Sequence, residues 1–232
     1  MKLIPVIDLK GGLVVAARRG ERHRYAPITS PLCPTAAPAA VAAALLGLHP
    51  FALLYLADLD AIGGAAGHLE VVERLHRQHP GVSLWVDRGL TALARLAHVA
   101  RPVIGSESIA DLAQWAALKA RLDAPVLSLD YRADQFLGPA GLDRRPELWP
   151  TDLILMTLAR VGSGQGPDLD RLDALRRLAP GHRVYAAGGV RDAADLRQLR
   201  ALGVAGALVS TALHQGRIGP GDLAELDDAQ ST

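Results

Sequence analysis

The stretch that decides the fold is Leu3-Ile4-Pro5-Val6-Ile7-Asp8, a short apolar run that ends on a carboxylate. Further runs rich in Val, Ile and Leu follow along the chain, and each stops at a Gly, Asp, Ser or Thr. These runs predict eight strands, at residues 3–8, 53–59, 83–87, 102–104, 126–130, 152–157, 183–187 and 206–209. Strands this apolar are typical of a parallel sheet that is buried on both faces.

Helical periodicity fills the intervals between the expected strands. Leu, Ile and Val recur at helical spacing beside Arg, Asp and Gln at residues 69–78, 109–122, 169–178 and 193–202. Eight βα units in 232 residues fit a closed (β/α)8 TIM barrel, which typically has about 250 residues. An open doubly wound sheet is disfavoured, because no Gly-x-Gly-x-x-Gly follows the first strand. We therefore expect an α/β fold in which residues 1–232 form a single (β/α)8 barrel.

The chain also contains pairs of segments that match each other in order. The pairs are residues 4–8 with 124–130, residues 85–90 with 185–190, and residues 103–106 with 208–211. Three matches in register indicate an internal duplication. We expect twofold pseudo-symmetry, with half-barrels at about residues 1–122 and 123–232.

Composition excludes several classes of partner. The net charge of +1 and an aromatic content of 4% argue against a nucleic-acid partner, which needs a basic surface or stacking side chains. The N-terminal apolar run is too short for a signal peptide, and no uncharged stretch approaches the roughly 20 residues of a membrane span. The single cysteine, Cys33, suits a reducing compartment. We expect a soluble, cytoplasmic protein without a membrane partner, and its oligomeric state stays open.

Metal and hydrolase signatures are absent from the sequence. The eight histidines form neither His-x-His nor His-Glu-x-x-His, and Gly-x-Ser-x-Gly does not occur. These spacings mark common zinc sites and serine hydrolases. The sequence therefore predicts no metal ion and no serine nucleophile of that kind.

Two aspartates terminate opposite strands of the expected barrel. Active sites of this fold lie at the C-terminal ends of the strands, where Asp8 follows the first strand and Asp130 the fifth. One carboxylate as base and one as acid across the barrel mouth would suit proton transfer on a substrate between them. Alternatively, each aspartate caps a turn or pairs with a cation such as Lys10 or Arg132. The symmetric placement of the two favours the catalytic interpretation.

A phosphate site is predicted after the seventh and eighth strands. Gly188 and Gly189 follow the seventh strand, and Ser210 and Thr211 follow the eighth. Loops at these two places commonly hold phosphate in this fold, because glycines let backbone amides approach and hydroxyls donate hydrogen bonds. An ordinary turn or glycine helix cap is the alternative.

The other half of the chain offers a weaker counterpart of this phosphate site. Gly89 follows the third strand, and Gly105 and Ser106 follow the fourth. Asp87 would repel a phosphate there unless Arg88 neutralises it, and a salt bridge between Asp87 and Arg88 is the alternative. Two phosphate sites would imply an elongated substrate with a phosphate at each end.

Two loops are candidates to cover the substrate. The glycine-rich stretch at residues 159–167, with Ser163 and Gly164, would be a mobile loop whose serine contacts the reacting group. A merely flexible connection is the alternative. The first connection carries a basic run at residues 18–25, which would cover an anionic ligand or simply be solvated.

The chain resembles the HisA/HisF family of histidine biosynthesis, and more closely its HisA isomerases. The resemblance rests on Ile4-Pro5-Val6-Ile7-Asp8-Leu9-Lys10-Gly11-Gly12, Leu56-Ala57-Asp58-Leu59-Asp60-Ala61, Ser128-Leu129-Asp130, Ala187-Gly188-Gly189-Val190 and Leu213-His214-Gln215-Gly216-Arg217-Ile218. It implies a duplicated half-barrel and a small-molecule substrate with two phosphates. It also implies an Amadori rearrangement of an aminoaldose to a ketose, with Asp8 as base, Asp130 as acid and no cofactor.

The sequence departs from that family at two turns. Residues 87–90 read Asp-Arg-Gly-Leu where the family usually has a Gly-Gly-Gly-Ile-Arg-like turn, and residues 156–163 lack the two acidic positions of the usual Thr-Asp-x-x-Arg-Asp-Gly-Thr. Two alternatives to the isomerase therefore remain. One is a divergent paralogue with another phosphorylated substrate, for example in the synthesis of a C1-carrier coenzyme. The other is a noncatalytic barrel that binds a phosphorylated ligand.

Overall fold

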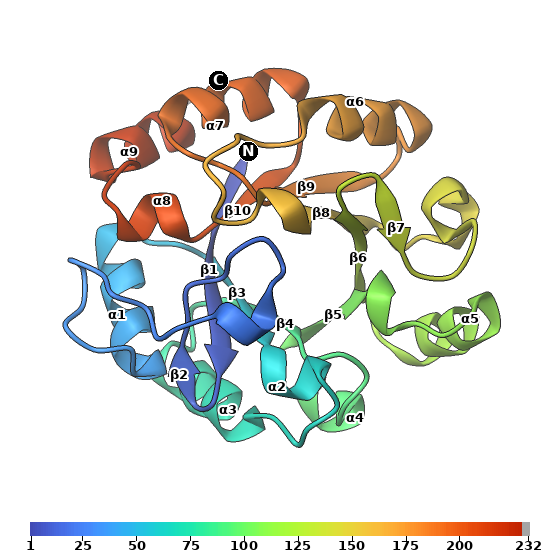
Figure 1. Ribbon diagram of the computed structural model, residues 1–232, viewed down its shortest axis with the longest axis horizontal. Helices are drawn as coiled ribbons and strands as arrows, with labels where there is room; N and C mark the ends of the chain where they lie inside the picture. Colours follow the sequence, from blue (N-terminus) through green and yellow to red (C-terminus); the bar gives the residue numbers. More distant parts are fainter. Residues whose placement is uncertain (229–232) are drawn as a thin grey trace.

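The computed structural model describes residues 1–228, and these residues form a closed barrel (Figure 1). Its parallel strands, in spatial order, are β1 (Lys2–Lys10), β3 (Leu53–Asp58), β4 (Ser83–Asp87), β5 (Arg101–Gly105), β6 (Val126–Arg132), β8 (Asp152–Thr157), β9 (Arg183–Ala187) and β10 (Gly206–Val209). Pairing of β10 with β1 closes the ring. The predicted α/β barrel with eight parallel strands is thus confirmed, and the division into half-barrels stays a prediction.

Helices surround the strands and cover the outside of the barrel (Figure 1). The α-helices are α1 (Pro38–Leu48), α2 (Leu59–Ile62), α3 (Leu69–Gln78), α4 (Leu93–Leu96), α5 (Leu112–Arg121), α6 (Leu169–Leu178), α7 (Ala193–Leu202), α8 (Thr211–His214) and α9 (Pro220–Asp228). The expected helices at 69–78, 169–178 and 193–202 are confirmed with the same bounds. The expectation of a helix over 109–122 is wrong at its start, because the Asp111 carboxylate accepts a hydrogen bond from the amide of Gln114 and begins α5 at Leu112.

Short elements that the sequence pattern does not predict decorate the C-terminal ends of the strands. Two antiparallel hairpins arise where β2 (Leu13–Val14) folds back on β1 and β7 (Gln135–Leu137) on β6. The 3-10 helices are η1 (Arg22–Arg24), η2 (Ser106–Ser108), η3 (Leu142–Arg144), η4 (Pro146–Leu148) and η5 (Leu158–Arg160). The connection from β6 to β8 consists of β7, η3 and η4 in place of an α-helix. Within residues 1–228 we find no helix with the length and apolarity needed to cross a bilayer.

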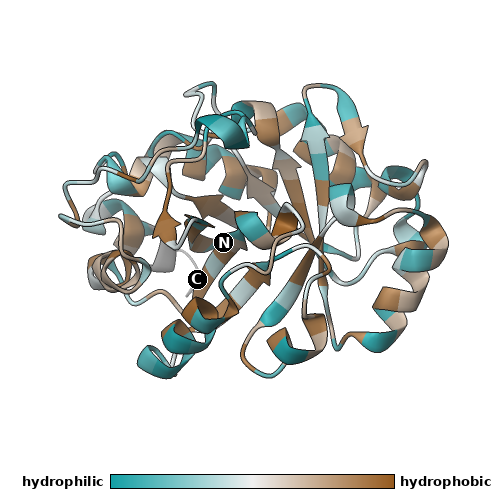
Figure 2. Cartoon of the chain, turned by 60° about the horizontal axis from the view of Figure 1, so that its bottom comes forward, coloured by the Kyte–Doolittle hydropathy of each residue, from teal (hydrophilic) through white to brown (hydrophobic). Residues whose placement is uncertain are grey.

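The alternation of side chains along the strands creates two separate apolar clusters. The cluster inside the barrel includes Ile4, Tyr55, Trp85 and Tyr185, whereas the larger cluster lies between the strands and the helices. Figure 2 shows the same layering, with hydrophobic strands inside and hydrophilic outer faces on the helices. Because successive residues of a strand point to opposite faces, every second position faces the barrel interior.

Strand register places three carboxylates in the uppermost interior row. Asp8 of β1 and Asp87 of β4 are both level with Ala57 of β3, which lies between them. Asp130 is the last interior position of β6 before its hairpin, two residues after Ser128. The spatial order of the strands puts β1 and β6 on opposite sides of the barrel. Asp8 and Asp130 therefore face each other across the C-terminal mouth.

An ion-pair network surrounds the buried Asp152 at the opposite end of the barrel. Asp152, which is fully buried, forms ion pairs with Arg101 and Arg183 at 2.6 Å each and accepts a hydrogen bond from the Tyr185 hydroxyl. Burial alone would raise the pKa of Asp152, but the hydrogen bonds from Arg183 and Arg101 outweigh it and lower the pKa. Trp85 packs edge-on against Tyr185 above this network. Asp152 and its three partners thus stabilise this end of the barrel.

Candidate active site

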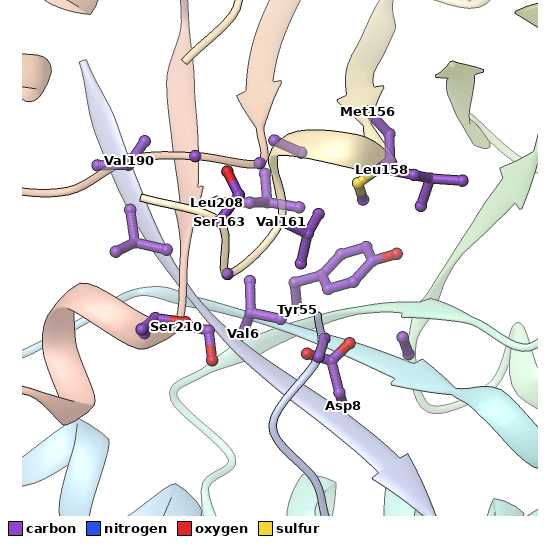
Figure 3. Close-up of a pocket in the computed structure, with 18 of the residues that line it drawn as sticks. Val6, Asp8, Tyr55, Met156, Leu158, Val161, Ser163, Val190, Leu208 and Ser210 are labelled. Carbon is purple, nitrogen blue, oxygen red and sulfur yellow. The ribbon is translucent and has the colours of Figure 1, made fainter. Parts of the chain in front are cut away.

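A cavity of about 300 Å³ opens at the C-terminal ends of the strands. Its size lies at the lower end of the range typical of small-molecule sites. Of the residues predicted from sequence, the cavity is lined by Asp8, Asp130, Ser163, Gly164, Gly188, Gly189, Ser210 and Thr211. Figure 3 shows four contributors from different elements around the same pocket, namely Asp8, Tyr55, Ser163 and Ser210. Gly89, Gly105 and Ser106 do not line it.

Asp8 presents an uncommitted carboxylate to the cavity. It is partly buried at the end of the interior row of β1, and its side chain forms no hydrogen bond or ion pair with the described residues. Burial raises the pKa of Asp8 to about 7, although the nearby Arg22 guanidinium opposes this shift. Lys10 instead donates to the Arg22 carbonyl oxygen, so the alternative pairing of Asp8 with Lys10 is not formed. A carboxylate with a pKa near neutrality suits a general base.

Asp130 is more deeply enclosed and is held by several donors. It is 5% exposed, and its Oδ1 accepts from the Ser128 hydroxyl at 2.6 Å, while Oδ2 accepts from the Glu107 amide at 3.3 Å. Burial nevertheless dominates and raises the pKa of Asp130 to about 8, with the Ser128 hydrogen bond opposing it. At neutral pH this carboxyl is mostly protonated, which is the state that a general acid requires.

Asp87 is a third cavity carboxylate, and the sequence pattern identifies it only as an obstacle to phosphate. It is 8% exposed, and its Oδ1 accepts from the Gly89 amide at 3.0 Å. Burial raises the pKa of Asp87 to about 7. A Cβ on Gly105 would stand 3.2 Å from Asp87 Oδ2 and 3.0 Å from Asp130 Oδ2. The missing side chain of Gly105 thus makes room for the two carboxylates.

The first loop and η2 add a charged pair to the same wall. Arg22 of η1 forms an ion pair with Glu107 of η2, and both line the cavity together with Tyr25. Burial would lower the pKa of Arg22, but the contact with Glu107 outweighs this effect and raises it. The basic run at residues 18–25 therefore covers the cavity in part. Glu107 is a site residue that the sequence pattern does not predict, because 85 positions separate it from Arg22.

Hydrogen-bond donors without partners gather at the β9–β10 side of the cavity. The hydroxyls of Ser210 and Thr211 form no hydrogen bond within the described residues. The Arg217 side chain forms no ion pair with any carboxylate of these residues. Gly189 lies beside them with φ +92°, and a Cβ there would collide with the Gly166 carbonyl oxygen. Only glycine therefore lets this backbone pack against the neighbouring loop.

The loop after β8 packs against the first loop above the cavity. The Arg19 amide donates to the Val161 carbonyl oxygen at 2.8 Å, which joins the two loops. The Ser163 hydroxyl donates to the Arg160 carbonyl oxygen at 2.8 Å, so in this conformation it stabilises its own turn. Gly164 has φ +72° and open space around it. The two loops together form the rim of the pocket.

The three residues predicted for a second phosphate site are engaged within the protein. The Gly89 amide donates to Asp87, and the Ser106 hydroxyl donates to the Leu137 carbonyl oxygen at 2.5 Å while accepting from the Asp130 amide at 2.9 Å. Ser106 thus joins η2 to β6 and to the β7 hairpin.

The alternative of a salt bridge between Asp87 and Arg88 is wrong. The Arg88 side chain is buried, pairs with Asp58 at 3.2 Å and donates to the carbonyl oxygens of Ala66 and Thr91. Asp87 faces the barrel interior, and successive residues of a strand point to opposite faces. The side chain of the next residue, Arg88, therefore points outward, away from the mouth. The charge of Asp87 is not balanced by this arginine.

One group of side chains has the spacing of metal ligands. Ligand atoms of Asp58, Asp60 and His68 lie within 4.8 Å of one another. Protein donors already use them, since Asp58 Oδ2 accepts from the His68 amide and Asp60 Oδ2 accepts from the Gly11 amide at 2.6 Å. The His68 ring also contacts Asp60 Oδ2 at 2.8 Å. This network fixes the turn between β1 and β2, next to the strand that carries Asp8.

Comparison with known proteins assigns the family. A family model described as histidine biosynthesis protein matches residues 2–219. The chain belongs to the histidine biosynthesis (HisA/HisF) family. The resemblance on which the sequence interpretation rests is therefore confirmed, and it extends over nearly the whole barrel.

Three relatives illustrate the range of this histidine biosynthesis family. The chain is 28% identical to an uncharacterized protein of Methanocaldococcus jannaschii, with 97% of each chain covered. It is 30% identical to a protein of Symbiobacterium thermophilum, with 97% of this chain and 95% of the relative covered, and 32% identical to one of Stenotrophomonas maltophilia, with 95% and 96% covered. Both of these are named as isomerases of an imidazole-4-carboxamide that carries two phosphoribosyl groups.

Proposed function

We propose that this member of the HisA/HisF family is an aldose–ketose isomerase that converts a phosphorylated aminoaldose to an aminoketose by an Amadori rearrangement. The observation that carries the proposal is the placement of two carboxylates with raised pKa values, Asp8 and Asp130, on opposite sides of one cavity. The partnerless hydroxyls of Ser210 and Thr211, with Gly188, Gly189 and Arg217 beside them, support binding of the substrate phosphate at the β9–β10 side.

The reaction needs one acid and one base and no net gain or loss of electrons. Asp130 donates its proton to the ring oxygen of the aminoaldose, the C1–O bond breaks, and the amine nitrogen shares its lone pair to form a C1=N Schiff base. Asp8 then removes the proton from C2, and those electrons form the C1=C2 bond as the nitrogen regains its lone pair. The enol hydroxyl at C2 loses its proton as C1 gains one, which leaves the ketose. Every step is a proton transfer, so the two carboxyls suffice.

The electrostatics of the cavity support this division of roles. Around pH 7, Asp130 with a pKa of about 8 is mainly protonated, whereas Asp8 with a pKa of about 7 is ionised in about half of the molecules. Asp8 is also free of hydrogen-bond donors among the described residues, so its oxygen is open to a substrate proton. The pair thus starts in the protonation states that the proposed order of steps requires.

Turnover of the histidine-pathway aminoaldose phosphate by the purified protein tests the proposal, with detection through the next enzyme of that pathway. Asp8→Asn and Asp130→Asn should each lower kcat by about 10²–10⁴-fold, with an unchanged circular dichroism spectrum. Asp170→Asn, on the exposed side of α6, is the matched control and should keep full activity. Full activity in either cavity variant contradicts the proposed mechanism.

Two outcomes point to the alternatives. A folded protein that binds inorganic phosphate at the β9–β10 side but does not turn over this compound is a paralogue with another phosphorylated substrate. A protein whose melting temperature rises with phosphorylated ligands, and for which no aminoaldose phosphate is a substrate, is a binding barrel. The buried, single Cys33 supports the proposal that the protein works in the reducing cytoplasm.

A further inference from the structure

The two sides of the cavity differ in the groups they offer to a ligand. The β9–β10 side presents the Ser210 and Thr211 hydroxyls and Arg217. The β4–β6 side presents the carboxylates of Asp87 and Glu107 beside Asp130. A ligand that spans the cavity therefore meets donors at one end and acceptors at the other.

Two backbone amides and one hydroxyl at the β4–β6 side already donate to groups of the protein. The Gly89 amide donates to Asp87 Oδ1 at 3.0 Å, and the Glu107 amide donates to Asp130 Oδ2 at 3.3 Å. The Ser106 hydroxyl donates to a backbone carbonyl oxygen. The protein's own carboxylates thus occupy amides that a second phosphate would otherwise bind.

The cations at this side compensate only part of the charge of the acidic groups. Arg22 is bound by Glu107, and no other cation of the described residues pairs with Asp87 or Asp130. Asp87 is more than nine-tenths buried as a residue and lines the cavity, and its Oδ2 accepts no hydrogen bond from the described residues. This oxygen is therefore open to a hydrogen-bond donor of a bound ligand.

We propose that the cavity takes a substrate with a single phosphate, held at the β9–β10 side, whose opposite end carries a protonated amine, separate from the reacting nitrogen at C1, that lies between Asp87 and Glu107. The inference rests on the proposed function, since it names the substrate class of the same cavity. It replaces the second phosphate that the family resemblance implies by a group of opposite charge. An ammonium group donates three hydrogen bonds, which suits Asp87 Oδ2, whereas a phosphate there meets the carboxylates of Asp87, Glu107 and Asp130.

Binding measurements on the wild-type protein test this inference without any turnover. Isothermal titration compares three matched series of equal chain length, namely aminoalkyl phosphates, alkyl phosphates and alkane bisphosphates. We expect the best aminoalkyl phosphate to bind at least tenfold more tightly than its alkyl counterpart, and the bisphosphate to bind more weakly than both. A bisphosphate that binds as tightly as the aminoalkyl phosphate overturns the inference, and so does an equal affinity for the amine and alkyl series.

Substitutions then locate the preference. Asp87→Gly frees the Gly89 amide, and Glu107→Gln frees Arg22, so the double variant should lose the preference for the amine and gain at least tenfold in affinity for the bisphosphate. Asp170→Asn is the matched control and should keep the wild-type order. If the folded double variant still prefers the amine, the assignment to Asp87 and Glu107 is wrong.

Failure of this inference is distinct from failure of the isomerase proposal. Asp8→Asn should abolish turnover while keeping the binding preference for the amine. A protein that prefers aminoalkyl phosphates but isomerises no aminoaldose supports the inference and contradicts the proposed activity. A protein that isomerises the doubly phosphorylated compound and binds bisphosphates best does the reverse.

Discussion

Replacement of Asp130 by Asn should make the protein more stable at neutral and alkaline pH while it removes the proposed general acid. The Asp130 carboxyl is 5% exposed, and burial raises its pKa from 3.8 to about 8 despite the hydrogen bond from Ser128. A carboxyl whose pKa is higher in the folded than in the unfolded protein stabilises the fold fully below pH 3.8. This contribution is lost as the pH rises through the folded-state pKa.

The magnitude follows from the two pKa values. Between pH 5 and pH 8 the unfolded carboxyl is ionised while the folded one stays largely protonated. Over three pH units, at 1.4 kcal/mol each, the free energy of unfolding therefore falls by at most about 4 kcal/mol. Asn does not titrate, but its single oxygen cannot accept from both Ser128 and the Glu107 amide, and each lost bond costs about 1 kcal/mol. We expect a net gain of about 1–3 kcal/mol at pH 8.

The assay is urea denaturation of both proteins at pH 5 and pH 8. Asp130→Asn should be about 1 kcal/mol less stable than wild type at pH 5, because of the lost hydrogen bond, and about 1–3 kcal/mol more stable at pH 8, which raises the midpoint of its urea transition. Asp170→Asn, whose side chain is exposed, should show no such change with pH. An Asp130→Asn protein that differs from wild type by the same amount at both pH values refutes the reasoning, because it places the folded-state pKa near its ordinary value.

Four further predictions concern the scaffold of the barrel. Gly189→Ala places a Cβ against the Gly166 carbonyl oxygen at a position with φ +92°. It should therefore lower the free energy of unfolding by at least about 2 kcal/mol and weaken phosphate binding. Gly164→Ala, at φ +72° in open space, should lower it by only about 1 kcal/mol in the same denaturation assay. Arg88→Met leaves Asp58 buried without its partner and should cost about 3–5 kcal/mol, measured by urea denaturation. Asp152 has a lowered pKa because its hydrogen bonds from Arg183 and Arg101 outweigh burial. It therefore stabilises the fold above pH 3.8 and loses this effect as the pH falls further. Asp152→Asn should make the free energy of unfolding depend less on pH in the acid range, measured by urea denaturation.

The barrel and the placement of Asp8 and Asp130 at its mouth were predictable because they depend on local patterns. Each strand is an apolar run, and an aspartate at an interior position of the last row must face the mouth once the barrel closes. Asp8 and Asp130 satisfy both conditions, and the structure brings them to one cavity. The same alternation explains why Asp87, an interior position of β4, reaches the cavity while its neighbour Arg88 pairs behind the strand.

Other features depend on contacts between distant residues, which local patterns do not contain. The Ser106 hydroxyl donates a hydrogen bond to the Leu137 carbonyl oxygen, 31 positions away in β7. This strand has three residues, too few to show the alternation of apolar and polar side chains that marks a strand in a sequence. Glu107 pairs with Arg22 across 85 positions. A glycine or serine at a strand end therefore predicts a hydrogen-bond donor that could bind phosphate. Only the fold shows whether this donor already forms a hydrogen bond with another part of the protein.

The turns at residues 87–89 and 187–189 match in sequence position, and a comparison of them explains why the two sides of the cavity offer different groups to a ligand. Asp87 occupies the place that Ala187 has in the other half, and each is followed two residues later by a glycine, Gly89 or Gly189. The Gly89 amide bonds to the Asp87 carboxylate, whereas the Gly189 amide has no acceptor among the described residues. An alanine cannot supply such an acceptor, so the amide near residue 187 is left for an external anion. We therefore infer that the Asp87 carboxylate takes the place of an external anion at its own turn and leaves its second oxygen to a ligand of opposite charge. On this inference, residue 87 is the position that we expect to decide between a doubly phosphorylated substrate and a singly phosphorylated amine.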